Sequence, residues 1–168
     1  MLAAHECRAY EDSCYDKNAC NWPDLRKADK GSLWSSQWCH GAVGIGLARI
    51  ASSHCDQTRS AALVHDIEHA VENAMVKWPQ GVDTLCCGTL GAIELLAEAG
   101  KRLNRPTLGH LSTQRLGQII ANRNEQGDYA WNAGGAAFNL GLFRGLSGVG
   151  YTILRRLDPS LPNVLIWE

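Results

Sequence analysis

The sequence has little that would suit a membrane protein, a nucleic-acid-binding protein or an exported protein. No apolar stretch reaches the roughly 18 to 20 residues that a membrane-spanning helix needs. Lys and Arg number 16 against 17 Asp and Glu, so the net charge of −1 gives no basic surface for a nucleic acid. The first residues, MLAAHECRAYED, carry charge where a signal peptide would be apolar. We therefore expect a cytoplasmic protein with no membrane span and no nucleic-acid partner.

The cysteine count does not suit a complete set of disulfides. Seven cysteines leave at least one thiol unpaired, and no export signal accompanies them. Reduced thiols are therefore expected, and reduced thiols can bind a metal ion. At 168 residues, of which 45% are apolar, the chain has the size of one domain with its own core.

A glycine motif occurs three times. Each copy reads X-X-Gly-x-x-Gly and continues into small and apolar residues, and its first glycine is Gly41, Gly88 or Gly145. The spacing of 47 and then 57 residues is typical of an array of helix pairs. Each glycine pair should let the backbone approach a neighbour or take a positive φ, so that helices pack closely near one end. Each X-X pair should lie on the loop just before a helix.

The pattern between and after these motifs predicts two layers of helices. Apolar residues at three- and four-residue spacings predict an amphipathic outer helix over 57–78 and a weaker one over about 107–123. The segment 92–99 has little polar face apart from Glu94 and Glu98, which is typical of a buried inner helix. The segment 163–167 is the one stretch whose composition would suit a strand. The predicted class is all-α.

Three cysteines are the candidate metal ligands. Cys39 and Cys86 occupy the same position in the repeat, and Cys87 occupies the position of His40. Equivalent positions of neighbouring repeats lie on the same rim, so the thiols of Cys39, Cys86 and Cys87 should meet there. Three thiolates suit Zn²⁺ with a fourth position left open, as in catalytic rather than structural zinc sites. A substrate thiol in that position would lose its proton near neutral pH.

Other interpretations of these residues stay open. Unliganded cysteines usually behave as small apolar residues, which would make the chain a metal-free helical scaffold. His40 could be a ligand in a Cys39, His40 and Cys86 set, or it could contact the ligands from outside. Free thiols are expected at Cys7, Cys14, Cys20 and Cys55. Solvated side chains are expected at His5, His54, His65, His69 and His110.

The motifs of this chain resemble, in order and spacing, those of lanthionine synthetases. They are Asn21-Trp22-Pro23-Asp24-Leu25-Arg26, Trp38-Cys39-His40-Gly41-Ala42, Leu85-Cys86-Cys87-Gly88 and Gly141-Leu142-Phe143-Arg144-Gly145-Leu146-Ser147-Gly148-Val149-Gly150-Tyr151, followed by Asp158-Pro159-Ser160-Leu161. They are most similar to the LanC-like cyclase domain of the bifunctional, class II (LanM-type) enzymes. The resemblance runs from about Ala9 to Glu168.

The resemblance implies a fold, a metal and a reaction. The fold would be an α/α toroid of inner and outer helices, with zinc held by Cys39, Cys86 and Cys87 at the end of the inner barrel. The zinc would activate cysteine thiols of a dehydrated precursor peptide, which add to dehydroalanine or dehydrobutyrine and form the thioether rings of a lanthipeptide. Relatives often have histidine at position 87, proline at position 43 and glutamine at position 144, where this chain has Cys87, Val43 and Arg144.

The same resemblance implies that residues 1–168 are the C-terminal portion of a cyclase domain. Related domains have many more inner helices than three glycine motifs supply. The N-terminal half, with its acid and base residues, and the dehydratase domain are expected to be absent. An open arc leaves apolar flanks. Three explanations stay open: a split gene product that pairs with another chain, a fragmentary gene model, or self-association that rebuilds a ring. The alternative function is a non-catalytic zinc-bearing helical module that binds a peptide or a partner chain.

Overall fold

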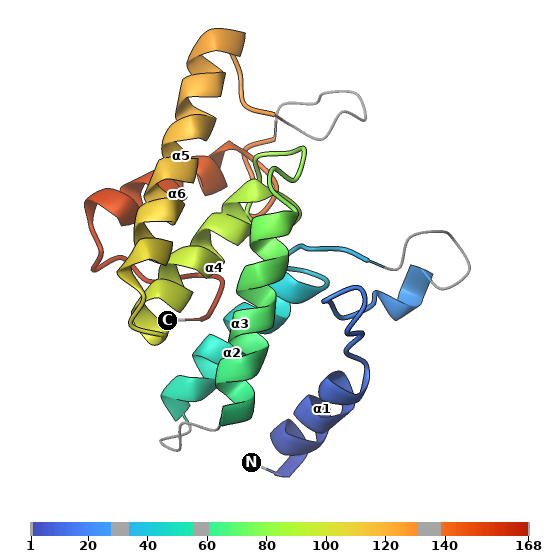
Figure 1. Cartoon of the computed structure of the whole chain (residues 1–168). Helices are drawn as coiled ribbons and strands as arrows, with labels where there is room; N and C mark the ends of the chain where they lie inside the picture. Colours follow the sequence, from blue (N-terminus) through green and yellow to red (C-terminus); the bar gives the residue numbers. More distant parts are fainter. Residues whose placement is uncertain (1, 28–33, 56–60, 131–138, 168) are drawn as a thin grey trace.

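The computed structural model describes residues 2–27, 34–55, 61–130 and 139–167 of the chain (Figure 1). These residues form six α-helices and one short 3-10 helix, and no strand lies among them. The elements are α1 (Leu2–Ser13), η1 (Leu25–Lys27), α2 (Ala42–Cys55), α3 (Ala61–Val76), α4 (Thr89–Arg102), α5 (Pro106–Gln126) and α6 (Leu146–Leu157). The predicted all-α class is confirmed.

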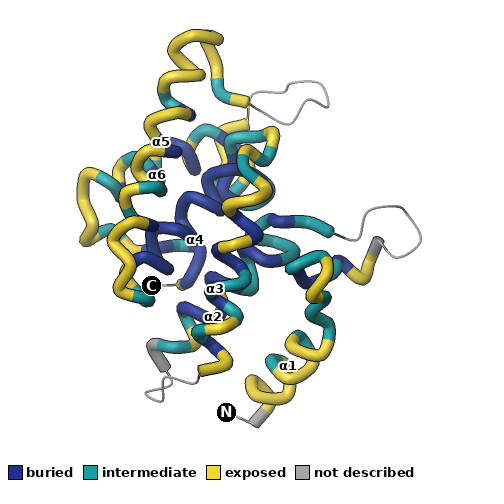
Figure 2. The backbone as a smooth tube through the Cα atoms, viewed as in Figure 1, coloured by how far each residue is buried: buried dark blue, intermediate teal, exposed yellow. Residues whose placement is uncertain are grey.

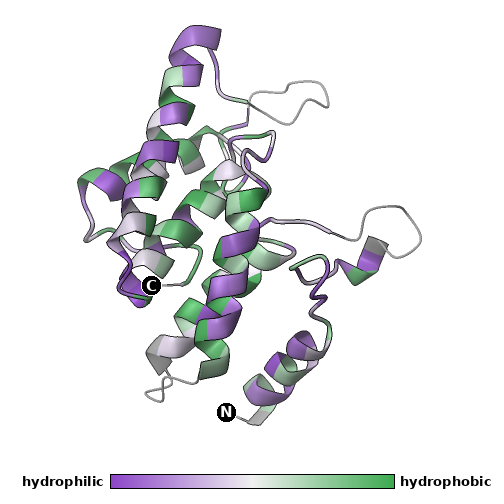
Figure 3. Cartoon of the chain, viewed as in Figure 1, coloured by the Kyte–Doolittle hydropathy of each residue, from purple (hydrophilic) through white to green (hydrophobic). Residues whose placement is uncertain are grey.

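The helices form an inner and an outer layer around α4. Helix α4 packs against α2 and α6, while α3 covers α2 and α5 covers α4. Every residue from Thr89 to Gly100 is buried, and Figure 2 shows α4 as the most continuously buried helix. Figure 3 shows hydrophilic residues gathered along α1, α3 and α5. This alternation is consistent with an arc of an α/α toroid.

The ends of the outer helices follow local backbone chemistry. Helix α3 ends at Val76, and it could not have continued far because Trp78, directly before Pro79, is disfavoured in helical geometry. Residues 57–60 of the helix predicted over 57–78 lie outside the described residues. Helix α5 is longer than the predicted 107–123. It begins at Pro106, which suits the first helical position, and stops at Gly127, whose φ of 84° ends the helix in the left-handed region.

The segment 163–167 forms turns, so the strand suggested for it is wrong. The Asn163 side-chain oxygen accepts a hydrogen bond from the Leu165 N–H (3.0 Å), and the Asn163 carbonyl accepts one from the Ile166 N–H (3.0 Å). An asparagine that bonds its own neighbouring backbone competes with strand pairing. Side chains of this segment instead pack into the core, where Leu165 and Ile166 are buried.

The second glycine of the motif makes the same close backbone contact in all three copies. A methyl group at Gly44 would lie 2.0 Å from the carbonyl oxygen of Trp38, six residues earlier. The equivalent distances are 2.6 Å at Gly91 and 2.1 Å at Gly148, each again to the carbonyl six residues earlier. The predicted close packing is therefore between the first helical turn and its own preceding loop. This contact holds each loop against the N-terminus of α2, α4 or α6.

The two carboxylates of α4 do not form an exposed polar face. Glu94 and Glu98 are 1% and 5% exposed, and both accept hydrogen bonds from Arg155 of α6. Burying a charge is tolerated only when it is paired. Helix α6 therefore packs on α4 through a buried ion cluster as well as through apolar contacts.

None of the described helices combines the length and the hydropathy that crossing a membrane requires.

Candidate metal centre

Backbone hydrogen bonds stack the loops before α2, α4 and α6 on one another. The Trp38 and Cys39 N–H groups donate to the carbonyl of Cys86, at 3.0 and 3.4 Å. The Cys86 N–H in turn donates to the carbonyl of Phe143 at 2.8 Å. Cys39, Cys86 and Phe143 occupy the same position in the repeat, so each loop is bonded to its equivalent in the next repeat. Residues at this position consequently lie side by side at one end of the helical layer.

The three thiols predicted to meet do lie together. The sulfur atoms of Cys39 and Cys87 are 3.6 Å apart, those of Cys86 and Cys87 are 3.2 Å apart, and all three lie within 4.8 Å of one another. Four ligands around zinc with Zn–S bonds of about 2.3 Å would place the sulfurs about 3.8 Å apart. The observed spacing is therefore compatible with a single metal ion. Within the described ranges, no other group of three or more His, Cys, Asp or Glu side chains gathers in this way.

The protonation of these thiols depends on what binds them. Partial burial raises the pKa of the Cys39 thiol and of the Cys86 thiol above the usual value, and hydrogen bonds and charge from the neighbouring cysteines raise that of Cys86 further. Without a cation, Cys39 and Cys86 therefore hold their protons at neutral pH. Metal binding to it would release them, which makes metal affinity increase with pH. All three cysteines are partly exposed, so a ligand from outside can reach them.

His40 lies beside the cluster but is held by other groups. Its Nε2 atom contacts the Arg26 guanidinium, which also donates to the buried Asp24 carboxylate at 2.9 and 3.0 Å. These hydrogen bonds hold the pKa of Asp24 well below its usual range. The geometry gathers Cys87 rather than His40 with Cys39 and Cys86. It therefore favours contact from outside over a Cys39, His40 and Cys86 ligand set.

The loop before α2 depends on a residue whose role the sequence did not reveal. Asn21 is 1% exposed, and its side-chain oxygen accepts hydrogen bonds from the N–H groups of Ala42 and Trp22, both at 2.8 Å. Its side-chain amide donates to the carbonyl of Ser35 at 3.0 Å. Asn21 thus caps α2 from a distant part of the chain and fixes the loop that carries Cys39. In the sequence, the one sign of this role was that Asn21 begins the first of the motifs described above.

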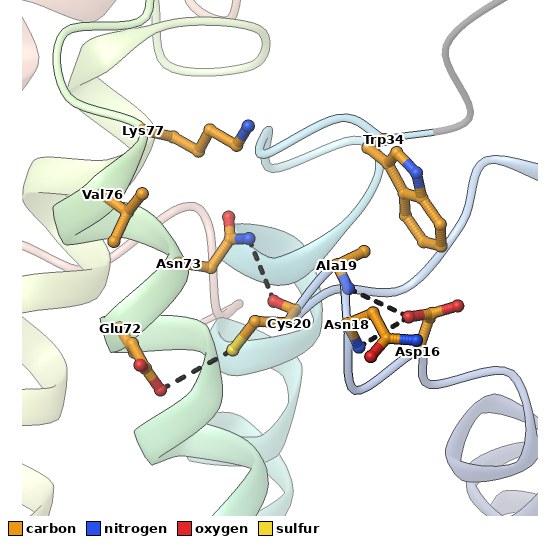
Figure 4. Close-up of a pocket in the computed structure, with 9 residues that line it drawn as sticks. All are labelled: Asp16, Asn18, Ala19, Cys20, Trp34, Glu72, Asn73, Val76 and Lys77. Carbon is orange, nitrogen blue, oxygen red and sulfur yellow. Dashed lines mark hydrogen bonds between the residues drawn. The ribbon is translucent and has the colours of Figure 1, made fainter.

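A pocket of about 560 Å³ lies beside the segment that leads to Asn21 (Figure 4). In it, the Asn73 side chain of α3 donates to the Cys20 carbonyl at 3.0 Å, and the Cys20 thiol points to Glu72 at 3.6 Å. None of the three clustered cysteines lines this pocket. Its contacts attach the segment carrying Asn21 to α3. They therefore also support the loop that carries Cys39, which Asn21 holds in place.

The remaining sequence predictions have mixed outcomes. Cys7, Cys14 and Cys20 are free thiols as predicted, whereas the side chain of Cys55 lies outside the described part of the chain. Exposed histidines as predicted are His5, His65 and His110. The prediction was wrong for His69, which is half-buried and stacks on the Tyr15 ring with a centroid distance of 4.7 Å. Burial lowers the pKa of His69. The side chain of His54 is not among those described.

The fold and the site together define a protein of paired inner and outer helices whose inter-repeat loops gather three thiols at one rim. The chain belongs to the lanthionine synthetase C-like protein family, whose sequence profile matches residues 2–166. It is also similar to the lacticin 481/lactococcin biosynthesis protein LcnDR2 of Lactococcus lactis subsp. lactis, with 29% identity over 163 residues. This similarity covers 91% of the chain and 17% of LcnDR2, so the chain spans less than a fifth of that relative.

Proposed function

We propose that this chain is the metal-bearing portion of a lanthionine cyclase domain, with Cys39, Cys86 and Cys87 holding Zn²⁺. The observation that carries the proposal is the group of three thiols from two repeats, gathered within 4.8 Å. Membership of the lanthionine synthetase C-like family, and similarity to a protein of lacticin 481 biosynthesis, supply the reaction class. The substrate would be a dehydrated precursor peptide.

The proposed reaction forms a thioether. The sulfur of a peptide cysteine bonds to the β-carbon of dehydroalanine or dehydrobutyrine, and the α-carbon takes up a proton. Bound Zn²⁺ would lower the pKa of a coordinating peptide thiol. Three anionic protein ligands leave that thiol more reactive than a set with a neutral histidine would. The partial exposure of the cluster gives the peptide access.

Arg26 is placed to offset the negative charge of such a centre. Its side chain is 68% exposed and ion-paired with Asp24, and its guanidinium lies close enough to interact with Cys39 and His40. In this proposal, Arg26 and His40 form a polar, cationic edge beside the thiols. The reduced state that the thiols require supports a cytoplasmic location.

We further propose that residues 1–168 are a C-terminal portion of the cyclase domain and that another polypeptide or a second copy completes it. Four large apolar side chains of α6 and the segments around it are exposed by more than half: Leu140, Leu154, Leu157 and Trp167. Large apolar side chains left exposed in this way are expected at an interface with a partner. The same observation favours a second candidate function, a non-catalytic zinc-bearing module that binds a peptide or a partner chain.

Metal analysis and thiol counting on one purified sample test both functions. We expect stoichiometric zinc in the wild type, its loss in Cys86→Ser, and its retention in Cys7→Ser, whose thiol is exposed and outside the cluster. A dehydrated precursor peptide is then incubated with the protein, and its free thiols are alkylated and counted by mass spectrometry. A falling count supports the cyclase. A constant count with zinc bound supports the binding module, and absence of zinc from the wild type contradicts both.

A further inference from the structure

Trp38, which directly precedes Cys39, is held by a segment far away in the sequence. Its indole N–H donates to the carbonyl of Leu165 at 3.0 Å, across 127 residues of chain. Its ring stacks on Phe143, with centroids 5.1 Å apart and planes 11° apart. Its backbone N–H donates to Cys86. Trp38 therefore joins the segment 163–167, the loop before α6 and the loop that carries Cys86.

The segment 163–167 is itself fixed by the buried ion cluster of α4 and α6. The Asn163 side chain is 1% exposed, and its amide donates to Glu94 at 3.3 Å and to Glu98 at 3.1 Å. Arg155 donates to the same two carboxylates. Buried carboxylates with several partners resist movement, because losing a partner would leave a charge unpaired in the core. Asn163 is thus attached to a buried and multiply hydrogen-bonded part of the described fold.

One continuous series of hydrogen bonds links this ion cluster to the loop that carries Cys39. It runs from Glu94 and Glu98 to the Asn163 amide, from the Asn163 oxygen to the Leu165 N–H, and from the Leu165 carbonyl to the Trp38 indole. Leu165 is 3% exposed, so water does not readily replace Trp38 as the donor to its carbonyl. This series therefore connects the loop that carries Cys39 to the buried ion cluster.

We propose that Asn163 and Trp38 are positioning residues for the metal centre. Asn163 fixes the segment 163–167 on the buried ion cluster, this segment fixes Trp38, and Trp38 sets the distance from Cys39 to Cys86 and Cys87. The inference rests on the proposed function, since it assumes that the three thiols bind a metal. It goes beyond that function by assigning a role at the site to residues that do not contact the metal.

The test uses Trp38→Phe and Asn163→Ala in the full chain, with binding of Zn²⁺ and Co²⁺ as readouts. Trp38→Phe keeps an aromatic ring against Phe143 and removes the indole N–H together with the rest of the five-membered ring, a loss of volume that Trp78→Phe reproduces. Groups that orient metal ligands typically change affinity by about 10- to 100-fold when mutated, and we expect about tenfold weaker Zn²⁺ binding in chelator competition. The visible absorption of the Co²⁺–thiolate complex should also change, because it reports the arrangement of the sulfurs around the ion.

Matched controls separate positioning from general stability. Trp78→Phe changes another half-buried tryptophan, which packs on Arg115 and is not part of the three-thiol group. Ser112→Ala removes a buried hydroxyl that accepts a hydrogen bond from Arg156 at 3.1 Å and donates one to the Ile93 carbonyl at 2.9 Å. Both controls should keep wild-type Zn²⁺ affinity and the wild-type Co²⁺ spectrum even where they lower the melting temperature.

The binding measurements distinguish failure of the proposed function from failure of the positioning role. If the wild type binds neither ion, the proposed function fails and the positioning role with it. If the wild type binds metal and the two variants match it, or lose affinity only as much as the controls do, the positioning proposal is wrong. Should Asn163→Ala not fold, Trp38→Phe decides alone. Unfolding of both variants while the controls stay folded would also contradict the proposal, because it would show a role in overall stability.

Discussion

Arg155→Met should be strongly destabilising, because it would remove the guanidinium shared by two buried carboxylates. The Arg155 side chain is 7% exposed, and those of its partners Glu94 and Glu98 are 2% and 7% exposed. Removing one partner of a buried ion pair typically costs about 3–5 kcal/mol. A native domain is usually stable by only about 5–15 kcal/mol in total. This one substitution would therefore remove a large share of the stability.

The size of this loss should depend on pH. Burial alone would raise the pKa of Glu98, but the hydrogen bond from Arg155 and the nearby Lys101 outweigh it and lower the pKa. Glu98 thus contributes stability that is present above its unfolded pKa and is lost as pH falls through its folded pKa. Burial raises the pKa of Glu94 despite its arginine partners, so its own contribution has the opposite sign. Without Arg155 both folded pKa values rise, so the deficit of the variant should be greatest near neutral pH and shrink in acid.

Urea unfolding followed by circular dichroism at pH 7 and pH 4.5 would measure both effects. Arg102→Met is a matched control, since Arg102 is a half-buried arginine of α4 that bonds the Ser53 hydroxyl at 2.6 Å rather than a carboxylate. It should cost about 1 kcal/mol with little dependence on pH. A loss below about 1 kcal/mol for Arg155→Met, or an equal loss at both pH values, would refute the electrostatic account.

Three further substitutions test the loops and the outer layer. Gly91→Ala would place a methyl group 2.6 Å from the Leu85 carbonyl, so we expect about 1–3 kcal/mol of destabilisation and weaker Zn²⁺ binding; wild-type affinity would contradict the fixed loop geometry. Arg115→Lys would lose the contact with the Trp78 ring, 4.3 Å away, and hydrogen bonds to the last carbonyls of α3. Thermal unfolding should show that the free energy of unfolding falls by about 1–3 kcal/mol, and an unchanged melting temperature would contradict this role of Arg115. Arg26→Gln should weaken Zn²⁺ binding more at low than at high salt, and a salt-independent effect would argue against an electrostatic role.

The meeting of the three thiols could be predicted because it follows from repetition. Cys39 and Cys86 share a position in the repeat, and equivalent positions of stacked helix pairs lie side by side whatever the details of packing. Cys87 adjoins Cys86 in the chain, so its proximity needed no further information. The role of these residues as metal ligands stays a prediction. The orientation of His40 could not be predicted, since it depends on Arg26 from a separate segment.

The polar contacts that hold the site in place could not be predicted from the sequence, for a physical reason. Glu94 and Glu98 look like a solvated stripe on an apolar helix until Arg155 is brought against them from another helix. The hydrogen bond from Trp38 to Leu165 likewise exists only once α6 has returned the chain to the first loop. Local signals were available for the ends of α5, where Pro106 and Gly127 mark the boundaries directly. Long-range polar contacts leave no such local pattern.

The backbone hydrogen bond from Cys39 to Cys86, and the equivalent one from Cys86 to Phe143, affect how this array of helix pairs would unfold. Helix-pair arrays can fray one unit at a time from an end, since each unit touches only its neighbours. An ion gripped by sulfurs from two successive units would prevent this, because opening the first unit would also eject the ion from the second. Amide hydrogen exchange should then show α2 and α4 opening as a single cooperative block in the metal-loaded protein, while α6 retains its own rate.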